Sequence, residues 1–138
     1  MTEFTVRVNY SETDQMGVVY HSRYLVWLDV ARCEHIRSAG RSYASLEEQG
    51  FRLAVGDLRI RYRQPARYDD LVRVRCWVRD AASRRITFGY LLEVPARDVV
   101  VATAETAMFV LGRELTPSRL PKEVLALLPT EPDPVRLF

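Results

Sequence analysis

The sequence predicts an α+β domain in which one long helix packs against an antiparallel sheet. Apolar residues recur at helical spacing once, over 24–36, and then at strand spacing from residue 58 to residue 110. The length of 138 residues favours one domain, because domains usually run about 100 to 200 residues. We expect 1–138 to form a single domain with a C-terminal tail from about residue 122.

The first elements are a strand, a loop and the long helix. Apolar and polar residues alternate over 4–10, which is the period of a half-buried strand. The segment 11–17 is polar and ends in glycine, so it is expected to be a loop. The helix that follows can be capped by Ser22 and ended by Gly40.

The remaining expected elements are a short helix and four strands. A second, short helix is expected over 45–49, because Ser45 and Glu48 have the spacing of a capping box. Strands are expected from alternation over 58–62, 72–78, 86–94 and 99–110. We expect these strands to form an antiparallel meander that covers the helix.

The face of the sheet turned away from the helix carries apolar side chains that no element expected from the sequence would bury. Trp77 falls on the outward register of its strand, where a large apolar side chain would be exposed. We therefore expect a partner subunit to cover this face and the chain to be an oligomer.

The composition is that of a globular protein. Hydrophobic residues make up 48% and charged residues 28%, values that exclude a disordered chain. Cys33 and Cys76 are too few for a disulfide framework or a cysteine-rich zinc site. No stretch has the pattern of a signal peptide or the ~20 apolar residues of a membrane span, so we expect a cytoplasmic protein.

The basic residues are almost all arginine, with Lys122 as the single lysine among 20. From Arg59 to Arg85 there are nine Arg and three Asp, so this segment carries +6 and the rest of the chain −4. Such a segment indicates an anionic partner, although a solvated face in a protein from a GC-rich genome explains it equally. Nucleic-acid binding is disfavoured, because no recognised nucleic-acid motif accompanies the charge.

The loop before the long helix carries the strongest chemical signal. Asp14 lies shortly before Gly17 and the expected helix start at Ser22. A helix start presents unpaired N–H groups and a positive dipole end, which can bind a developing oxyanion. A nearby carboxylate can act as a nucleophile or as a general base for water. The alternative is structural: Asp14 forms an Asx-turn and His21 packs or caps locally.

This stretch contains the motif D-x-x-G-V-V-Y-H-x-x-Y-L, formed by Asp14, Gly17, Val18, Val19, Tyr20, His21, Tyr24 and Leu25. The motif resembles the signature of the hot-dog-fold thioesterases of the 4-hydroxybenzoyl-CoA thioesterase and YbgC-like group. Three later segments resemble the same family: Ala31-Arg32, the Y-x-x-P-A pattern at 62–66, and Tyr68-Asp69-Asp70-Leu71, which is similar to the family's D-D-x-L turn. The resemblance covers about residues 4 to 121.

The resemblance implies a hot-dog fold, in which a long central helix is wrapped by an antiparallel sheet of about five strands. It implies a homo-oligomer whose dimers join their sheets and often pair into tetramers. It also implies an acyl-CoA thioesterase that uses Asp14 as the catalytic carboxylate and the N–H of His21 to polarise the carbonyl. Tyr10 would hydrogen-bond the carboxylate, and Gly17, Val18 and Tyr20 would shape the oxyanion loop. No metal or redox cofactor is implied, and coenzyme A enters only as part of the substrate.

The sequence also suggests roles for several arginines and for two residues that depart from the family pattern. Arg84 and Arg85, in a turn between strands, are candidates to bind the phosphates of coenzyme A through their planar guanidinium groups. The arginines at 59, 61 and 63 are expected to form a solvated or intersubunit ladder. Asp29 replaces the usual glutamate and is expected to pair with Arg32. Met16 replaces a small residue and is expected to trim the acyl pocket.

Three other functions stay open from the residues. The chain could be an acyl-carrier-protein thioesterase. It could be a hot-dog dehydratase of 3-hydroxyacyl thioesters that uses His21 and Asp29. It could also be a non-catalytic acyl-CoA-binding or scaffold protein, although intact Asp14, Gly17 and His21 argue against lost activity.

Overall fold

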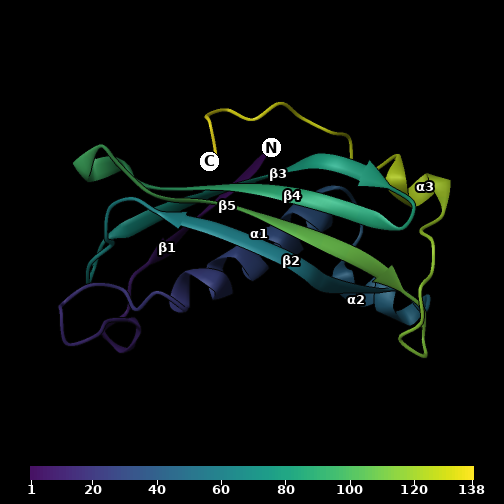
Figure 1. Cartoon of the computed structure of the whole chain (residues 1–138), viewed down its shortest axis with the longest axis horizontal. Coiled ribbons are helices and arrows are strands. Elements are labelled where there is room, and N and C mark those ends of the chain that lie inside the picture. Colours follow the sequence, from purple (N-terminus) through teal and green to yellow (C-terminus); the bar gives the residue numbers. More distant parts are fainter.

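The computed structural model describes all 138 residues and is built from one sheet, with the long helix on one of its sides (Figure 1). Its strands are β1 (Thr2–Arg7), β2 (Arg52–Tyr62), β3 (Leu71–Ala82), β4 (Arg85–Val94) and β5 (Val99–Leu111). Its α-helices are α1 (Arg23–Ser38), α2 (Tyr43–Glu48) and α3 (Lys122–Leu125), and its short 3-10 helices are η1 (Tyr10–Glu12) and η2 (Pro95–Arg97).

The five strands are all antiparallel and lie in the order β1-β3-β4-β5-β2. Helix α1 packs on β1 and β3 and buries one face, which carries Tyr24, Trp27, Leu28, Ala31 and Ile36. These side chains join the sheet in a main core of 27 buried residues. The expected long helix against a five-stranded antiparallel sheet is confirmed.

The expected meander is wrong for one strand. Only β3, β4 and β5 follow one another in the sheet, whereas β2 pairs with β5 at the far edge. The connection 63–70 therefore crosses the sheet from β2 to β3 instead of forming a hairpin. Alternation predicts strands but not their order, because order depends on contacts between distant segments.

Two element boundaries also differ from the expectation. The first strand ends at Arg7, because the Glu12 side chain accepts from the N–H of Asn9 at 2.8 Å and closes a helical turn there. Helix α2 begins earlier than expected, because Ser42 is its N-cap and accepts from the N–H of Ser45 at 3.0 Å.

The outer face of the sheet is covered by the chain itself. Residues 129–138, which we call the C-terminal strap, run back along this face (Figure 1). Leu137 packs on Trp77 and Leu91, and all three are at most 2% exposed. The indole N–H of Trp77 donates to Asp133 at 2.9 Å, and the hydroxyl of Thr103 donates to the carbonyl of Leu137 at 2.6 Å. The expectation that a partner subunit covers Trp77 is therefore wrong.

An ion pair holds the middle of the strap. Both nitrogens of the Arg79 fork donate to the carboxylate of Asp133, at 2.8 and 2.7 Å. Burial raises the pKa of Asp133, but the hydrogen bonds from Arg79 and Trp77 and the charge of Arg79 outweigh it and lower the pKa below the usual value. The strap is therefore docked by apolar contact and by a charge-assisted pair.

Several features bear on the expected class of protein. None of the helices has the length and apolar character needed to cross a membrane. Cys33 and Cys76 are both free thiols. No cluster of three or more His, Cys, Asp or Glu side chains could hold a metal ion.

Candidate active site

The loop between β1 and α1 is pinned at its base by Glu12. The Oε2 atom of Glu12 accepts from the indole N–H of Trp27 in α1 at 2.9 Å, and its carbonyl accepts from the N–H of Tyr20 at 2.9 Å. The Glu12 carboxylate also caps η1 through Asn9, so one side chain ties the loop to both flanking elements. This residue was missed in the sequence, although the spacing of Asn9 and Glu12 is that of a capping box.

The tip of the loop is a tight turn that presents Asp14. The N–H of Gly17 donates to the carbonyl of Asp14 at 3.0 Å, and Gly17 adopts φ 76°. The carboxylate oxygen Oδ1 of Asp14 accepts from the N–H of Met16 at 2.8 Å, which is an Asx-turn. Oδ2 makes no hydrogen bond within the chain, so the half-exposed carboxylate keeps a free oxygen. Met16 is 79% exposed and does not enclose a pocket within this chain.

The start of α1 presents unpaired donors beside this loop. The backbone N–H groups of His21 and Ser22 make no hydrogen bond within the chain. The hydroxyl of Tyr62 donates to the carbonyl oxygen of His21 at 2.9 Å. That carbonyl and the N–H of Ser22 belong to one planar peptide, so Tyr62 fixes the direction of this donor. Burial raises the pKa of Tyr62, which keeps its hydroxyl protonated and able to donate.

A cavity of about 220 Å³ opens next to the helix start. It is lined by Val19, His21, Tyr24, Tyr62, Arg63, Gln64 and Pro65. The lining is held from behind, because the N–H of Val19 donates to the carbonyl of Ala66 at 2.8 Å and the N–H of Ala66 donates to the hydroxyl of Tyr24 at 3.1 Å. The connection 63–70 therefore supplies one wall and the motif loop the other.

Asp14 does not line this cavity. Thr13 lies opposite Val19 in a short antiparallel bridge, and neighbouring side chains of an extended chain alternate between faces. Asp14 is thus directed to the other face from Val19.

Some candidate residues are not brought to this loop in the single chain. Tyr10 is 78% exposed and packs edge-on against Tyr68, and its hydroxyl makes no hydrogen bond to Asp14. Arg84 and Arg85 lie at the turn after β3, whereas the loop contacts the segment before β3. The 12-residue β3 separates them by about 36 to 40 Å at about 3.3 Å per residue.

The expected partner of Asp29 is confirmed. Arg32 is 8% exposed and forms an ion pair with Asp29 one turn away along α1. The pairing occupies the acid with a neighbour on its own helix, as expected for an i,i+3 pair.

A long helix wrapped by a five-stranded antiparallel sheet, with an acid-bearing loop before the helix, defines the hot-dog fold. Residues 8–128 match the family described as the thioesterase-like superfamily, and the chain belongs to this superfamily.

Named relatives agree with this assignment. The chain is 38% identical over 124 residues to "Acyl-CoA thioesterase YbgC" of Haemophilus influenzae, covering 89% of this chain and 90% of that one. It superposes with a TM-score of 0.87 and 33% identity on the hypothetical protein TT1821 from Thermus thermophilus, covering 93% and 97% of the two chains. The DHNA-CoA thioesterase from Staphylococcus aureus gives a TM-score of 0.82 and 32% identity, covering 86% and 80%.

Proposed function

We propose that this protein hydrolyses acyl-CoA thioesters to a free acid and coenzyme A, with Asp14 as the reacting carboxylate. The chain is a thioester hydrolase of the thioesterase-like superfamily. The observation that carries the finer proposal is that one short segment holds both a carboxylate with a free oxygen, at Asp14, and two unpaired N–H groups, at the start of α1.

In the proposed reaction the thioester carbonyl lies at the mouth of the cavity, between Asp14 and the N–H of His21. Oδ2 of Asp14 either takes a proton from water, whose oxygen adds to the carbonyl carbon, or attacks that carbon itself. The negative charge that develops on the carbonyl oxygen is stabilised by the N–H groups of His21 and Ser22. The C–S bond then breaks and coenzyme A leaves as its thiolate, which takes up the proton held by Asp14 if water attacked, or a proton from solvent water if Asp14 attacked. In the attack by Asp14, water afterwards hydrolyses the resulting anhydride.

The remaining candidate residues keep supporting roles in the proposal. Gly17, Val18 and Tyr20 shape the loop, and the side chain of His21 orients water at the cavity mouth. Tyr10 can serve the carboxylate only after its side chain turns from Tyr68. The mechanism uses no metal and no redox cofactor, and a cytoplasmic location stays a prediction.

We further propose that the protein is a dimer joined through the edge of β2. This strand has 11 residues and pairs with β5 on one side only. Val55 and Leu58 on it are 52% and 40% exposed, and an open apolar edge is a template for pairing with a second strand. The strap already covers Trp77, so this side chain needs no further subunit to bury it. Arg84 and Arg85 could then reach a substrate only from the partner subunit.

The test is a thiol-release screen with acyl-CoAs of increasing chain length and with aromatic acyl groups. Release of free thiol from coenzyme A supports the proposal. Faster release from acyl carrier protein would assign the carrier-protein thioesterase instead. Enoyl absorbance from 3-hydroxyacyl-CoA without thiol release would assign the dehydratase, and tight acyl-CoA binding without release would assign the binding protein.

A further inference from the structure

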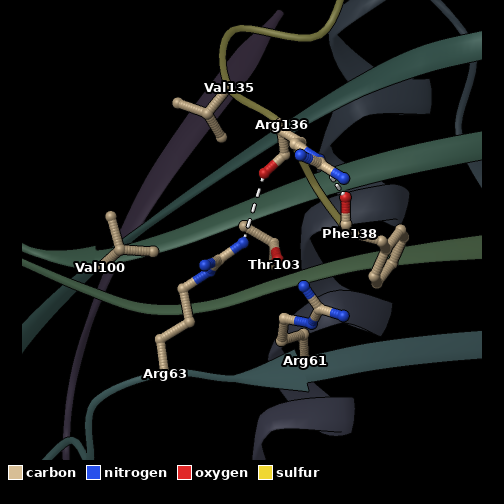
Figure 2. Close-up of a pocket in the computed structure, with 7 residues that line it drawn as sticks. All are labelled: Arg61, Arg63, Val100, Thr103, Val135, Arg136 and Phe138. Atoms are coloured by element: carbon tan, nitrogen blue, oxygen red, sulfur yellow. Dashed lines mark hydrogen bonds between the residues drawn. The ribbon is translucent and has the colours of Figure 1, made fainter.

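A second cavity lies on the outer face of the sheet, between that face and the C-terminal strap. It has a volume of about 470 Å³, which is within the range of small-molecule sites. Its floor includes Thr103. One wall is formed by Arg61, within β2, and by Arg63, directly after β2, and the other by Arg136 and Phe138 of the strap. Figure 2 shows the guanidinium ends of the three arginines gathered around the space above Thr103.

None of these three guanidinium groups pairs with the side chain of an Asp or Glu residue. Arg61 makes no hydrogen bond or ion pair within the chain. Arg63 donates to the neutral carbonyl oxygens of Arg136 and Leu137, at 3.3 and 3.4 Å. Arg136 donates through Nε to the main-chain oxygen of Phe138 at 2.6 Å. No Asp or Glu side chain lines the cavity, and the main-chain carboxylate of Phe138, the last residue, offsets only one of the three positive charges.

Three other arginines of this face do have acidic partners, whereas Arg59 makes no ion pair and lies over the ring of Phe138, 3.9 Å from its centroid. Arg73 and Arg75 share Glu93, with N–O distances of 3.0 and 2.6 Å. Arg79 pairs with both Asp133 and Glu105. The arginines without an acidic side-chain partner are therefore gathered around the end of the strap and this cavity. Like charges held together repel one another, and a bound anion relieves that repulsion.

We propose that this cavity binds the pyrophosphate group of a nucleotide, with Arg61, Arg63 and Arg136 as its ligands. A guanidinium group offers a planar fork that matches two phosphate oxygens, and a pyrophosphate presents enough oxygens for three such forks. The strap supplies Arg136 and thus completes the site when it docks on the sheet. The hydroxyl of Thr103 is already engaged with Leu137 and holds the strap in place.

The pyrophosphate has two chemical sources, the coenzyme A part of the substrate or a separate nucleotide. Arg63 lines both this cavity and the cavity beside His21, so this one side chain borders both spaces. A coenzyme A thioester could therefore place its acyl end at His21 and its phosphates here, and this source alone rests on the proposed function.

The test is calorimetric titration of the full chain with ADP and with inorganic pyrophosphate. Arg61→Ala and Arg136→Ala are each expected to weaken binding about tenfold, since each removes a charge-assisted contact. Arg119→Ala is the matched control: it removes an exposed, unpaired arginine after β5, at the opposite end of β2 from Arg61, and should leave binding unchanged. Circular dichroism checks that the variants fold. Absence of binding to the wild type, or equal losses in the control, would overturn the proposal.

Competition separates the two sources. If coenzyme A displaces ADP, and Arg61→Ala raises KM for acyl-CoA but not for an acyl-N-acetylcysteamine thioester, the phosphates belong to the substrate. If ADP binds and coenzyme A does not compete, the site takes a separate nucleotide. Both results support the cavity as a pyrophosphate site. A chain that hydrolyses no thioester would contradict the proposed function but would leave the ADP titration fully interpretable.

Discussion

Truncation of Leu137 to alanine tests whether the strap is part of the folded core. Leu137 is 2% exposed and packs on Trp77 and Leu91. Replacing a buried leucine by alanine costs about 2 to 5 kcal/mol, and the cost rises with the cavity left behind. Because the strap is irregular and can move toward the sheet, we expect the lower end, a loss of about 2 kcal/mol.

The assay is urea unfolding followed by tryptophan fluorescence and by circular dichroism, at one fixed protein concentration. With a urea dependence of about 2 kcal/mol per M, the midpoint should fall by about 1 M. Leu115→Ala is the control, since Leu115 is 66% exposed and its loss should cost at most about 0.5 kcal/mol. An unchanged midpoint for Leu137→Ala would refute the docked strap.

Three further variants probe the loop and the helix. Tyr62→Phe should lower kcat about two- to tenfold at unchanged KM, because the peptide between His21 and Ser22 loses the hydrogen bond that orients the N–H of Ser22. Steady-state thiol release measures kcat, and an unchanged value would contradict this role of Tyr62. Gly17→Ala should destabilise the protein by about 1 kcal/mol in thermal unfolding, because φ 76° is strained for alanine although its Cβ would meet no atom within 4 Å; an unchanged Tm would count against this reason. Burial lowers the pKa of His35 below 6.5, so as the pH falls the unfolded chain binds a proton at a higher pH than the folded chain does. The part of the free energy of unfolding that depends on this difference is fully present above about pH 6.5 and is lost as the pH falls below that value. The decrease in Tm from pH 7.5 to pH 5.5 should therefore be smaller for His35→Gln than for the wild type. An equal decrease in both proteins would exclude His35 as the cause.

The elements of the fold were predictable where their signals are local. The apolar period over 24–36 and the stop at Gly40 place α1 within one or two residues of its observed ends. The order of the strands was not predictable, because the pairing of β2 with β5 joins segments about 50 residues apart. The docking of the strap was missed for the same reason, since Leu137 meets Trp77 across 60 positions of the sequence.

The same distinction between local and long-range signals applies to the candidate active site. The turn at Asp14 and the helix start at Ser22 follow from neighbouring residues and were anticipated. The cavity also needs Tyr62, from β2, and its wall comes from a crossing connection whose path no local pattern gives. The convergence of Arg61 with Arg136 likewise depends on the path of the strap.

The role of Asp14 is the central claim, and Asp14→Asn tests it most directly. Asparagine keeps an Oδ1 that can accept from Met16, so the turn should survive while the carboxylate is lost. Asp98→Asn is the matched control, because Asp98 is exposed and lies at φ 53°, which asparagine tolerates. With the best acyl-CoA, the account predicts a fall in kcat of at least about 100-fold for Asp14→Asn and full activity for Asp98→Asn. Full thiol release by Asp14→Asn would contradict it.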